Sequence, residues 1–294
     1  MAEKPADGAL FEAEERKTFL TGRPYREFAA PKELDRHGPA KIISMVNQKG
    51  GVGKTTSTIN LGAALVEQGR KVLLVDLDPQ GALSAGLGIA HEDDQITVYD
   101  LLFDNTASIH AAIQHSKVSG LDLVPANIDL SAAEIQLVNE VGREHTLARA
   151  LRPVRNEYDY IFIDCGPSLG LLTVNALAAS HGVIIPMEGE YYSLRGLALL
   201  TDTVEKVRDR INFDLDIVGI LVTMFDRRTT HAREVIERVV EVFGDRVFDT
   251  VITRTVRFPE TSVAGEPIIT WAPHSQGAEQ YRQLALELLE RIDK

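Results

Sequence analysis

Short apolar runs alternate with stretches of helical periodicity from Lys41 to the end of the chain, and this alternation limits the folds that the sequence can adopt. Buried parallel strands connected by crossover helices have this pattern. The runs cover residues 41–47, 71–78, 121–126, 158–165, 182–188, 215–225 and 246–252, and the helical stretches include 56–68, 173–180, 197–211 and 275–293. The sequence therefore predicts an α/β fold with a doubly wound, mostly parallel sheet and helices on both faces, whose ligands bind at the carboxyl ends of the strands.

Residues 1–40 lack this regularity. They contain few aliphatic side chains and four prolines, at positions 5, 24, 31 and 39, and show no sustained periodicity. We expect a flexible N-terminal tail over 1–40 and one domain over 41–294, a length that a single large α/β domain can fill. Two short stretches, ALFEAEER and YREFAAP, leave two roles open for the tail: plain disorder, or a segment that a binding partner orders.

Composition excludes several classes of protein. With 44% hydrophobic and 25% charged residues, the chain resembles neither a disordered nor a membrane-spanning protein, and no apolar run approaches the roughly 18 residues of a membrane helix. The N-terminus has no apolar signal-peptide segment, so we expect a cytoplasmic location and no membrane partner. Cys165 is the single cysteine, which rules out an intramolecular disulfide and a cysteine-based zinc site.

The net charge of −12 argues against a general nucleic-acid binder, but the charges are unevenly distributed. Residues 195–257 carry eleven basic and eleven acidic side chains, so the rest of the chain carries the whole excess of negative charge. A surface for an anionic polymer would have to lie in this region. Solvated helix faces with i,i+4 ion pairs explain the same composition, and the charge count does not decide between the two.

The loop NQKGGVGKTT, Asn47 to Thr56, follows the first apolar run and precedes a helical stretch, which is the context of a phosphate-binding loop. Its glycines let successive backbone N–H groups turn toward an anion, and the helix that follows adds its positive N-terminal end. Lys54 would place a charge at the β- and γ-phosphates of a nucleotide, and the Thr55 hydroxyl would hold Mg²⁺. Gln48 stands where the usual loop has its first glycine, and Lys49 is an additional lysine.

Carboxylates end two of the apolar runs. VLLVDLDPQG ends with Asp76 and Asp78, and YDYIFIDCGPS ends with Asp164. Because the carboxyl ends of neighbouring parallel strands meet at one edge of a sheet, these side chains should converge on the loop. We expect Asp164 to bind Mg²⁺ through water and another of the three to orient an attacking water. A helix-capping role remains an alternative for Asp76 or Asp78 singly.

These motifs carry a resemblance to a known family. The K-G-G-x-G-K-T-T loop and the two strand ends are similar to those of the deviant Walker-A P-loop ATPases, specifically the ParA/Soj chromosome- and plasmid-partitioning proteins of the ParA/MinD group. The similarity extends through EGEYYSLRGL, ILVTMFDRRT, TVITRTVRFPE and GAEQYRQLA. It covers nearly all of the chain from Lys41 onward and is far more specific than an isolated phosphate loop.

The resemblance implies roles for individual residues. In this family the additional lysine reaches across a nucleotide-sandwich homodimer, so Lys49 would serve the ATP of the partner while Lys54 serves its own. Asp78 would position or activate the water, Asp76 would support the Mg²⁺ and nucleotide site, and Asp164 would be the Walker-B acid. The residues that the resemblance and the loop together assign to MgATP are Gly50, Gly51, Val52, Gly53, Lys54, Thr55, Thr56, Asp76 and Asp164.

The resemblance also implies that the ATP-bound dimer binds double-stranded DNA without sequence preference and is released when a ParB-like centromere-binding protein stimulates a weak hydrolysis. The matching basic positions are Arg228, Arg254 and Arg257, and the protein would be associated with the nucleoid. The chain departs from the family pattern at Thr253 and Thr255, which flank Arg254. These departures concern the list of DNA contacts rather than the ATPase.

Three other functions each match one part of the sequence. Gly166 to Gly170 fits the G-x-S-x-G motif of hydrolases, with Asp226 as a candidate acid, but Pro167 restricts the strained turn that the motif needs. A MinD-like membrane-associated ATPase would end in a basic amphipathic helix, whereas QLALELLERIDK is acidic. Iron–sulfur relatives that share the loop need more than one cysteine.

Overall fold

A computed structural model describes residues 18–89, 94–190 and 193–292. Within these residues one sheet has the strand order β3-β4-β2-β5-β1-β6-β7. The strands are β1 (Lys41–Met45), β2 (Val72–Leu77), β3 (Gln114–His115), β4 (Leu121–Val124), β5 (Tyr160–Cys165), β6 (Gly182–Glu188) and β7 (Asp216–Thr223). All neighbouring pairs are parallel except β3–β4. The predicted doubly wound, mostly parallel sheet is confirmed.

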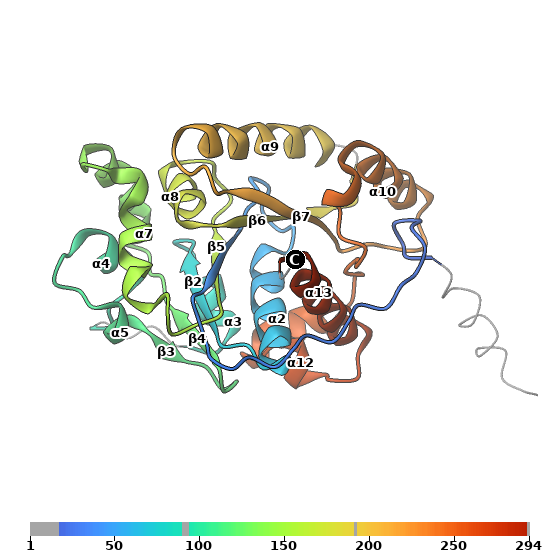
Figure 1. The fold of residues 1–294 in the computed structure, drawn as a ribbon, viewed down its shortest axis with the longest axis horizontal. Helices are drawn as coiled ribbons and strands as arrows, with labels where there is room; N and C mark the ends of the chain where they lie inside the picture. The colour runs from blue at the N-terminus through green and yellow to red at the C-terminus, as the bar shows by residue number, and fades with distance from the viewer. Residues whose placement is uncertain (1–17, 90–93, 191–192, 293–294) are drawn as a thin grey trace, which may run out of the picture.

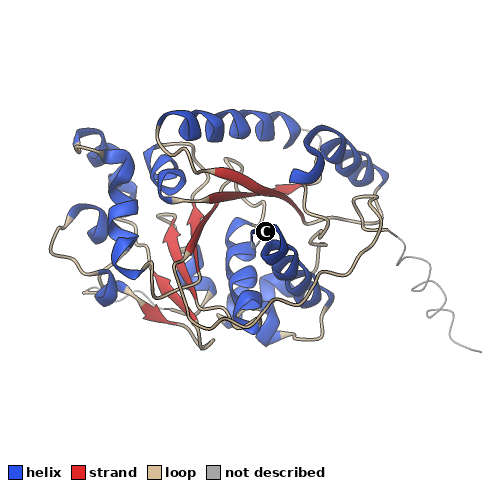
Figure 2. Ribbon diagram, viewed as in Figure 1, coloured by secondary structure: helices blue, strands red, loops and turns tan. Residues whose placement is uncertain are grey.

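Helices cover both faces of the sheet (Figures 1 and 2). One face packs on α2 (Lys54–Glu67), α3 (Ala82–Gly86), α12 (Ile268–Trp271) and α13 (Gln276–Ile292), with α11 (Arg257–Ala264) beside them. The other face packs on α4 (Val98–Phe103), α5 (Ile109–Ala112), α6 (Leu130–Gln136), α7 (Thr146–Leu151), α8 (Leu171–Ala179), α9 (Ser193–Arg210) and α10 (Thr230–Phe243). Alternate residues of the six longer strands therefore belong to two separate cores, which explains why these strands are predominantly apolar. No helix in the described part of the chain is both long and apolar enough to cross a membrane.

Six of the seven predicted strands are present, and the prediction of a strand over 246–252 is wrong. That segment runs beside β7 but makes only isolated bridges with it. The reason is a competing acceptor: the buried carboxylate of Glu287 takes the backbone N–H groups of Asp249 and Thr250 at 2.8 and 2.9 Å. The sequence analysis also missed the two-residue strand β3 at the edge of the sheet.

Residues 18–40, part of the expected flexible tail, lie against the domain in the structure. In Figure 1 this segment is the blue trace that passes α13 and α2 before it enters β1. Arg23 pairs with Asp249 at 2.7 Å and Arg26 pairs with Glu290 at 2.6 Å. The stretch YREFAAP forms no helix, and ALFEAEER lies outside the described residues. The segment has too few aliphatic residues for a core of its own, but its charged side chains find partners on the domain.

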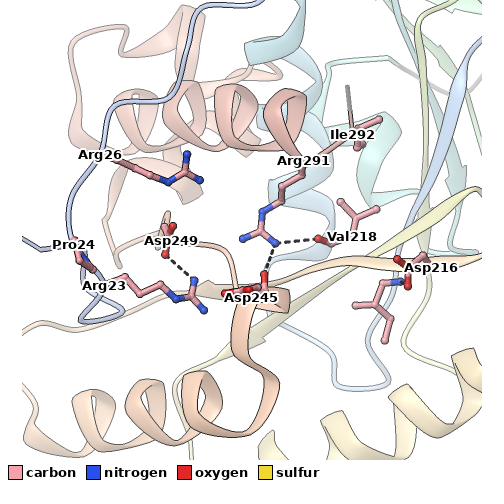
Figure 3. Close-up of a pocket in the computed structure, with 10 residues that line it drawn as sticks. Arg23, Pro24, Arg26, Asp216, Val218, Asp245, Asp249, Arg291 and Ile292 are labelled. Carbon is pink, nitrogen blue, oxygen red and sulfur yellow. Dashed lines mark hydrogen bonds and ion pairs between the residues drawn. The ribbon is translucent and has the colours of Figure 1, made fainter. Parts of the chain in front are cut away.

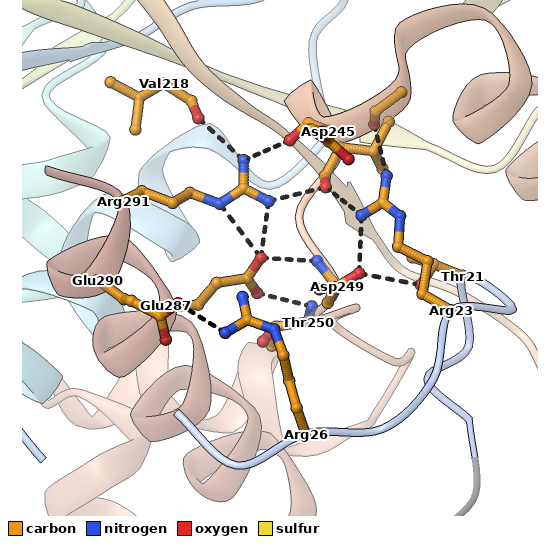
Figure 4. A network of polar contacts seen from close by, with 12 residues as sticks. Thr21, Arg23, Arg26, Val218, Asp245, Asp249, Thr250, Glu287, Glu290 and Arg291 are labelled. Atoms are coloured by element: carbon orange, nitrogen blue, oxygen red, sulfur yellow. Dashed lines mark hydrogen bonds and ion pairs between the residues drawn. The ribbon is translucent and has the colours of Figure 1, made fainter. Parts of the chain in front are cut away.

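The contacts of Arg23 belong to a larger network (Figure 4). Arg23 also donates to the carbonyl of Val247 at 2.9 Å, and Arg291 donates to the same carbonyl at 2.8 Å and to Glu287. The same arginines line a cavity of about 640 Å³ beside the start of β7 (Figure 3). Residues 18–40 thus contact residues 246–252, the segment for which the sequence predicted a seventh strand.

Candidate active site

The loop between β1 and α2 has the backbone geometry of an anion site. Gly51 and Gly53 adopt φ angles of +76° and +81°, in the left-handed region that favours glycine. Gly53 is the N-cap of α2 and provides no side-chain hydrogen bond to the first turn. An added Cβ at Gly50 or Gly51 would meet nothing within 4 Å. The first turn of α2 has no side-chain cap, so its N–H groups are available to an anion such as phosphate.

Lys54 and Thr55 occupy the first turn of α2 with different partners. Lys54 is only 7% exposed, and its Nζ donates to the carbonyl of Lys49 at 3.2 Å. Desolvation lowers the pKa of Lys54, and the charge of Asp164 opposes that effect. Thr55 Oγ1 donates to Asp164 Oδ2 at 2.6 Å. The structure thus brings together the three residues that the sequence assigned to phosphate and Mg²⁺.

Asp164 lies at the carboxyl-terminal end of β5 and is 1% exposed. Its second oxygen accepts a hydrogen bond from Thr58 at 3.3 Å. Burial, with the nearby charge of Asp76, raises the pKa of Asp164 to about 7. A cation such as Mg²⁺ bound at this position would offset the cost of ionising the buried carboxylate.

Asp76 and Asp78 have separate roles in the structure. Asp76 Oδ2 accepts hydrogen bonds from the N–H and hydroxyl of Ser84, at 3.1 and 3.0 Å, and Oδ1 accepts from the N–H of Asp78 at 3.2 Å. Asp76 therefore positions the loop that carries Asp78. Asp78 itself is half-buried and lies beside Gly166, where an added Cβ would approach its Cγ to 3.5 Å.

The additional lysine points toward the end of β6. Lys49 Nζ lies 3.3 Å from Glu188 Oε2 and 2.6 Å from Glu190 Oε2. The pKa of Lys49 is raised mainly by the hydrogen bond that it donates to Glu190, and Glu188 raises it further. The side chain is thus held by two acids, while Lys54 occupies the phosphate loop of its own subunit.

The predicted DNA-binding arginines lie at and beside a second cavity. This cavity, of about 880 Å³, adjoins Thr56 of the phosphate loop, and Arg228 and Arg254 line it. The Arg228 side chain is 87% exposed and makes two hydrogen bonds to Asp226, at 3.0 and 2.8 Å. Asp226, the candidate acid of a hydrolase triad, is therefore bound to Arg228.

The other two arginines have acidic partners as well. Arg254 pairs with Glu188 at 2.8 Å, and Arg257 pairs with Glu260 at 3.1 Å along α11. Arg254 lies on the wall of the cavity, whereas Arg257 begins the next helix. Arg228 and Arg254 thus line the cavity beside the phosphate loop, and Arg257 lies between two other residues of its lining, Val256 and Phe258.

Sequence reasoning missed several residues of the site. Glu188 and Glu190 follow a buried strand just as Asp76, Asp78 and Asp164 do, so the same rule could have found them. The hydroxyls that bind the buried acids, those of Thr58 and Ser84, had no comparable signal. Met224 lines the cavity of about 880 Å³ and has a φ angle of +51°, and no pattern in the sequence indicated its position there.

Comparisons with known proteins agree with this arrangement. A family model described as an AAA domain matches residues 40–217. An uncharacterised protein of Mycobacterium tuberculosis (strain ATCC 25618 / H37Rv) is 69% identical, over 93% of this chain and 86% of its own length. The sporulation initiation inhibitor protein Soj of Bacillus subtilis (strain 168) is 52% identical, over 84% of this chain and 98% of its own.

A solved structure extends the agreement to three dimensions. The crystal structure of cobyrinic acid a,c-diamide synthase from Mycobacterium smegmatis, with bound ADP and magnesium, is 39% identical to this chain. It covers 87% of this chain and 97% of its own, with a TM-score of 0.75. The order of the motifs, the fold and the identity to Soj over almost the whole domain lead to one conclusion: the chain belongs to the ParA/Soj family of chromosome-partitioning ATPases.

Proposed function

We propose that the chain is an ATP-dependent partitioning ATPase that binds MgATP at Gly50 to Thr56. The observation that carries the proposal is the convergence of Lys54, Thr55 and Asp164 at the N-terminus of α2. Lys54 is buried and its Nζ donates to a carbonyl, so a phosphate oxygen would add a charged acceptor for this ammonium group. The cavity of about 880 Å³ beside Thr56 has room for a nucleoside.

The site has the groups that hydrolysis of the γ-phosphate requires. Thr55 and Asp164 would hold Mg²⁺, which bridges and neutralises phosphate oxygens when it is bound. Asp78 would orient a water molecule toward the γ-phosphate, because it lies on a loop that Asp76 and Ser84 hold in place. Lys54 would stabilise the charge on the phosphate oxygens of its own subunit.

Lys49 is assigned to the nucleotide of a second subunit. In this homodimer the lysine leaves Glu188 and Glu190 and reaches the phosphates bound by the partner. Two subunits therefore close around two nucleotides, and hydrolysis opens the dimer. The M. smegmatis structure with ADP and magnesium supports the nucleotide assignment. The higher identity to Soj, 52% against 39%, favours partitioning over the amide-synthase activity in the name of that structure.

The partner of the ATP dimer is proposed to be double-stranded DNA of any sequence. Arg228, Arg254 and Arg257 would contact phosphates, and a dimer doubles every such contact. A ParB-like centromere-binding protein would stimulate a weak ATPase and release the DNA. The protein would act in the cytoplasm, on the nucleoid.

Binding to random-sequence duplex DNA tests the proposal. The purified protein is measured with ATP, with ADP and without nucleotide, at about 50 and 200 mM salt. ATP-dependent binding that weakens at the higher salt is expected. Absence of binding in every state, with ATPase activity intact, would contradict DNA partitioning, and binding to anionic vesicles would then favour a MinD-like function.

A further inference from the structure

We propose that Glu188 is a positioning residue that restrains Lys49 and Arg254 together and so competes with nucleotide phosphate for the first and with DNA phosphate for the second. The inference rests on the proposed function, in which Lys49 serves the nucleotide of the partner and Arg254 serves DNA. Glu188 itself touches neither ligand in this scheme. It acts as an internal carboxylate in the place of a phosphate.

The geometry of the bridge is specific. Glu188 is the last residue of β6, and its side chain is 16% exposed. One carboxylate oxygen, Oε2, accepts from Lys49 Nζ at 3.3 Å, and the other, Oε1, accepts from Arg254 at 2.8 Å. A single carboxylate therefore holds both basic groups at once.

The sheet order places Glu188 between these two groups. Strand β6 lies between β1, which leads into the phosphate loop, and β7, which leads into the loop of Arg228. The backbone of Arg254 is fixed to the start of that loop, because its N–H donates to the carbonyl of Phe225 at 3.0 Å. A turn from Glu188 toward DNA would therefore be a movement of the Arg254 side chain alone.

The chain offers a control for each half of the bridge. Among the described residues, the side-chain hydrogen bond of Glu190 is with Lys49, at 2.6 Å, and it makes none with Arg254. Glu260 holds Arg257 on α11, at 3.1 Å, and takes no part in the contacts of Lys49. Comparison of the three glutamates therefore separates a shared restraint from a local one.

Substitution by glutamine removes the charge of each glutamate without changing its size. Two quantities are measured: the concentration of a non-hydrolysable ATP analogue that half-saturates dimerisation, and the affinity of the analogue-saturated dimer for random duplex DNA. Glu188→Gln is expected to improve both by about two- to fivefold at low salt, the range for release of exposed ion pairs. Glu190→Gln should improve mainly dimerisation, because Glu190 makes a hydrogen bond to Lys49 and acts on Arg254 through charge alone. Glu260→Gln should improve DNA affinity alone. Glu188→Asp, which keeps the charge, should move both quantities back toward the wild-type values.

A reciprocal variant tests the bridge without DNA. Arg254→Gln leaves the whole of Glu188 to Lys49, so it should raise the analogue concentration needed for dimerisation by about twofold. An unchanged concentration would overturn the inference, as would a Glu188→Gln protein that alters one quantity and not the other.

Failure of the proposed function has a different signature. It would appear in the wild-type protein, as DNA binding that does not depend on ATP. Failure of the inference appears only in the variants, while the wild-type protein still binds DNA in an ATP-dependent way.

Discussion

Asp76 and Asp164 are register partners on the neighbouring parallel strands β2 and β5, and both side chains are buried, at 0% and 1% exposure. Burial raises the pKa of Asp76 to about 6 and that of Asp164 to about 7, and the charge of Asp76 adds to the cost of ionising Asp164. The nucleotide-free site therefore holds two carboxyls that resist ionisation. This is an unfavourable arrangement that a bound cation relieves.

The first prediction concerns the pH dependence of stability in metal-free protein. An unfolded aspartate loses its proton near pH 4, whereas the folded Asp164 keeps its proton to about pH 7. The folded state binds more protons between these values, so the free energy of unfolding should fall as the pH rises through them. Asp164→Asn should flatten this dependence and raise the thermal midpoint at pH 7.5 by at least about 2 °C.

Thermal scans from pH 5 to pH 8 in the presence of a chelator measure this effect. Asp202→Asn, a change on the exposed face of α9, serves as the control and should keep the wild-type slope. An Asp164→Asn protein with the wild-type slope would show that this carboxyl is ionised in the fold. The same variant should lose Mg²⁺-dependent nucleotide affinity.

The second prediction concerns Lys49→Ala. Removal of this side chain should abolish the ATP-dependent dimer and lower stimulated turnover by about 100-fold, the usual effect of losing one group that stabilises transition-state charge. ATP binding to the single subunit should persist, because Lys54 remains. Sedimentation with an ATP analogue and a phosphate-release assay test both effects. Lys206→Ala, which removes an exposed lysine from α9, is the control. An intact dimer with stimulated turnover would show that Lys49 does not act in trans.

The third prediction concerns Asp78→Ala. The dimer and its DNA binding should remain, because the hydrogen bonds of Asp78 lie within its own loop, while hydrolysis should fall by about 100-fold or more through loss of water positioning. Single-turnover hydrolysis, measured beside ATP-dependent DNA binding on the same preparation, checks this. Unchanged hydrolysis would exclude Asp78 from the positioning of water.

The fourth prediction concerns Arg228→Glu. The ATP dimer should still form, because the side chain of Arg228 is 87% exposed and is bonded to Asp226. DNA binding should weaken, and the slope of the salt dependence should decrease by about one unit for each DNA phosphate that the variant no longer binds. Arg238→Glu is a matched control, because Arg238 is also an exposed arginine paired with a nearby acid, Glu241. DNA titrations at several salt concentrations distinguish the variants. Equal weakening in both would indicate an effect of overall charge.

The fifth prediction concerns the N-terminal segment. Arg23 is partly buried and donates to Asp249 and to two backbone carbonyls, so Arg23→Ala should lower the free energy of unfolding by about 1–3 kcal/mol. Arg26→Ala should lower the free energy of unfolding by only about 0–1 kcal/mol, because the pair of Arg26 with Glu290 is more exposed. Urea unfolding measures the difference. Equal values would mean that the network in Figure 4 adds nothing beyond a surface ion pair.

Much of the site could be predicted because its parts follow local rules. A buried parallel strand is apolar along its whole length, and a phosphate loop needs glycine where φ is positive, as at Gly51 and Gly53. Carboxylates at strand ends must then meet at one edge of the sheet, which is the rule that predicts Asp76, Asp78 and Asp164. Local patterns were therefore enough to predict the fold class, six of the strands and the group formed by Lys54, Thr55 and Asp164.

Features that depend on contacts between residues far apart in the chain could not be predicted from local patterns. Residues 246–252 have the composition of a strand, but their backbone N–H groups bind Glu287, which lies 38 residues beyond Asp249. The segment 18–40 has no core of its own, and its place against the domain depends on contacts with distant residues, such as the pair of Arg23 with Asp249. Lys49 and Arg254 are more than 200 positions apart, and one carboxylate of Glu188 joins them. No local pattern encodes such a contact, because it depends on which strands become neighbours.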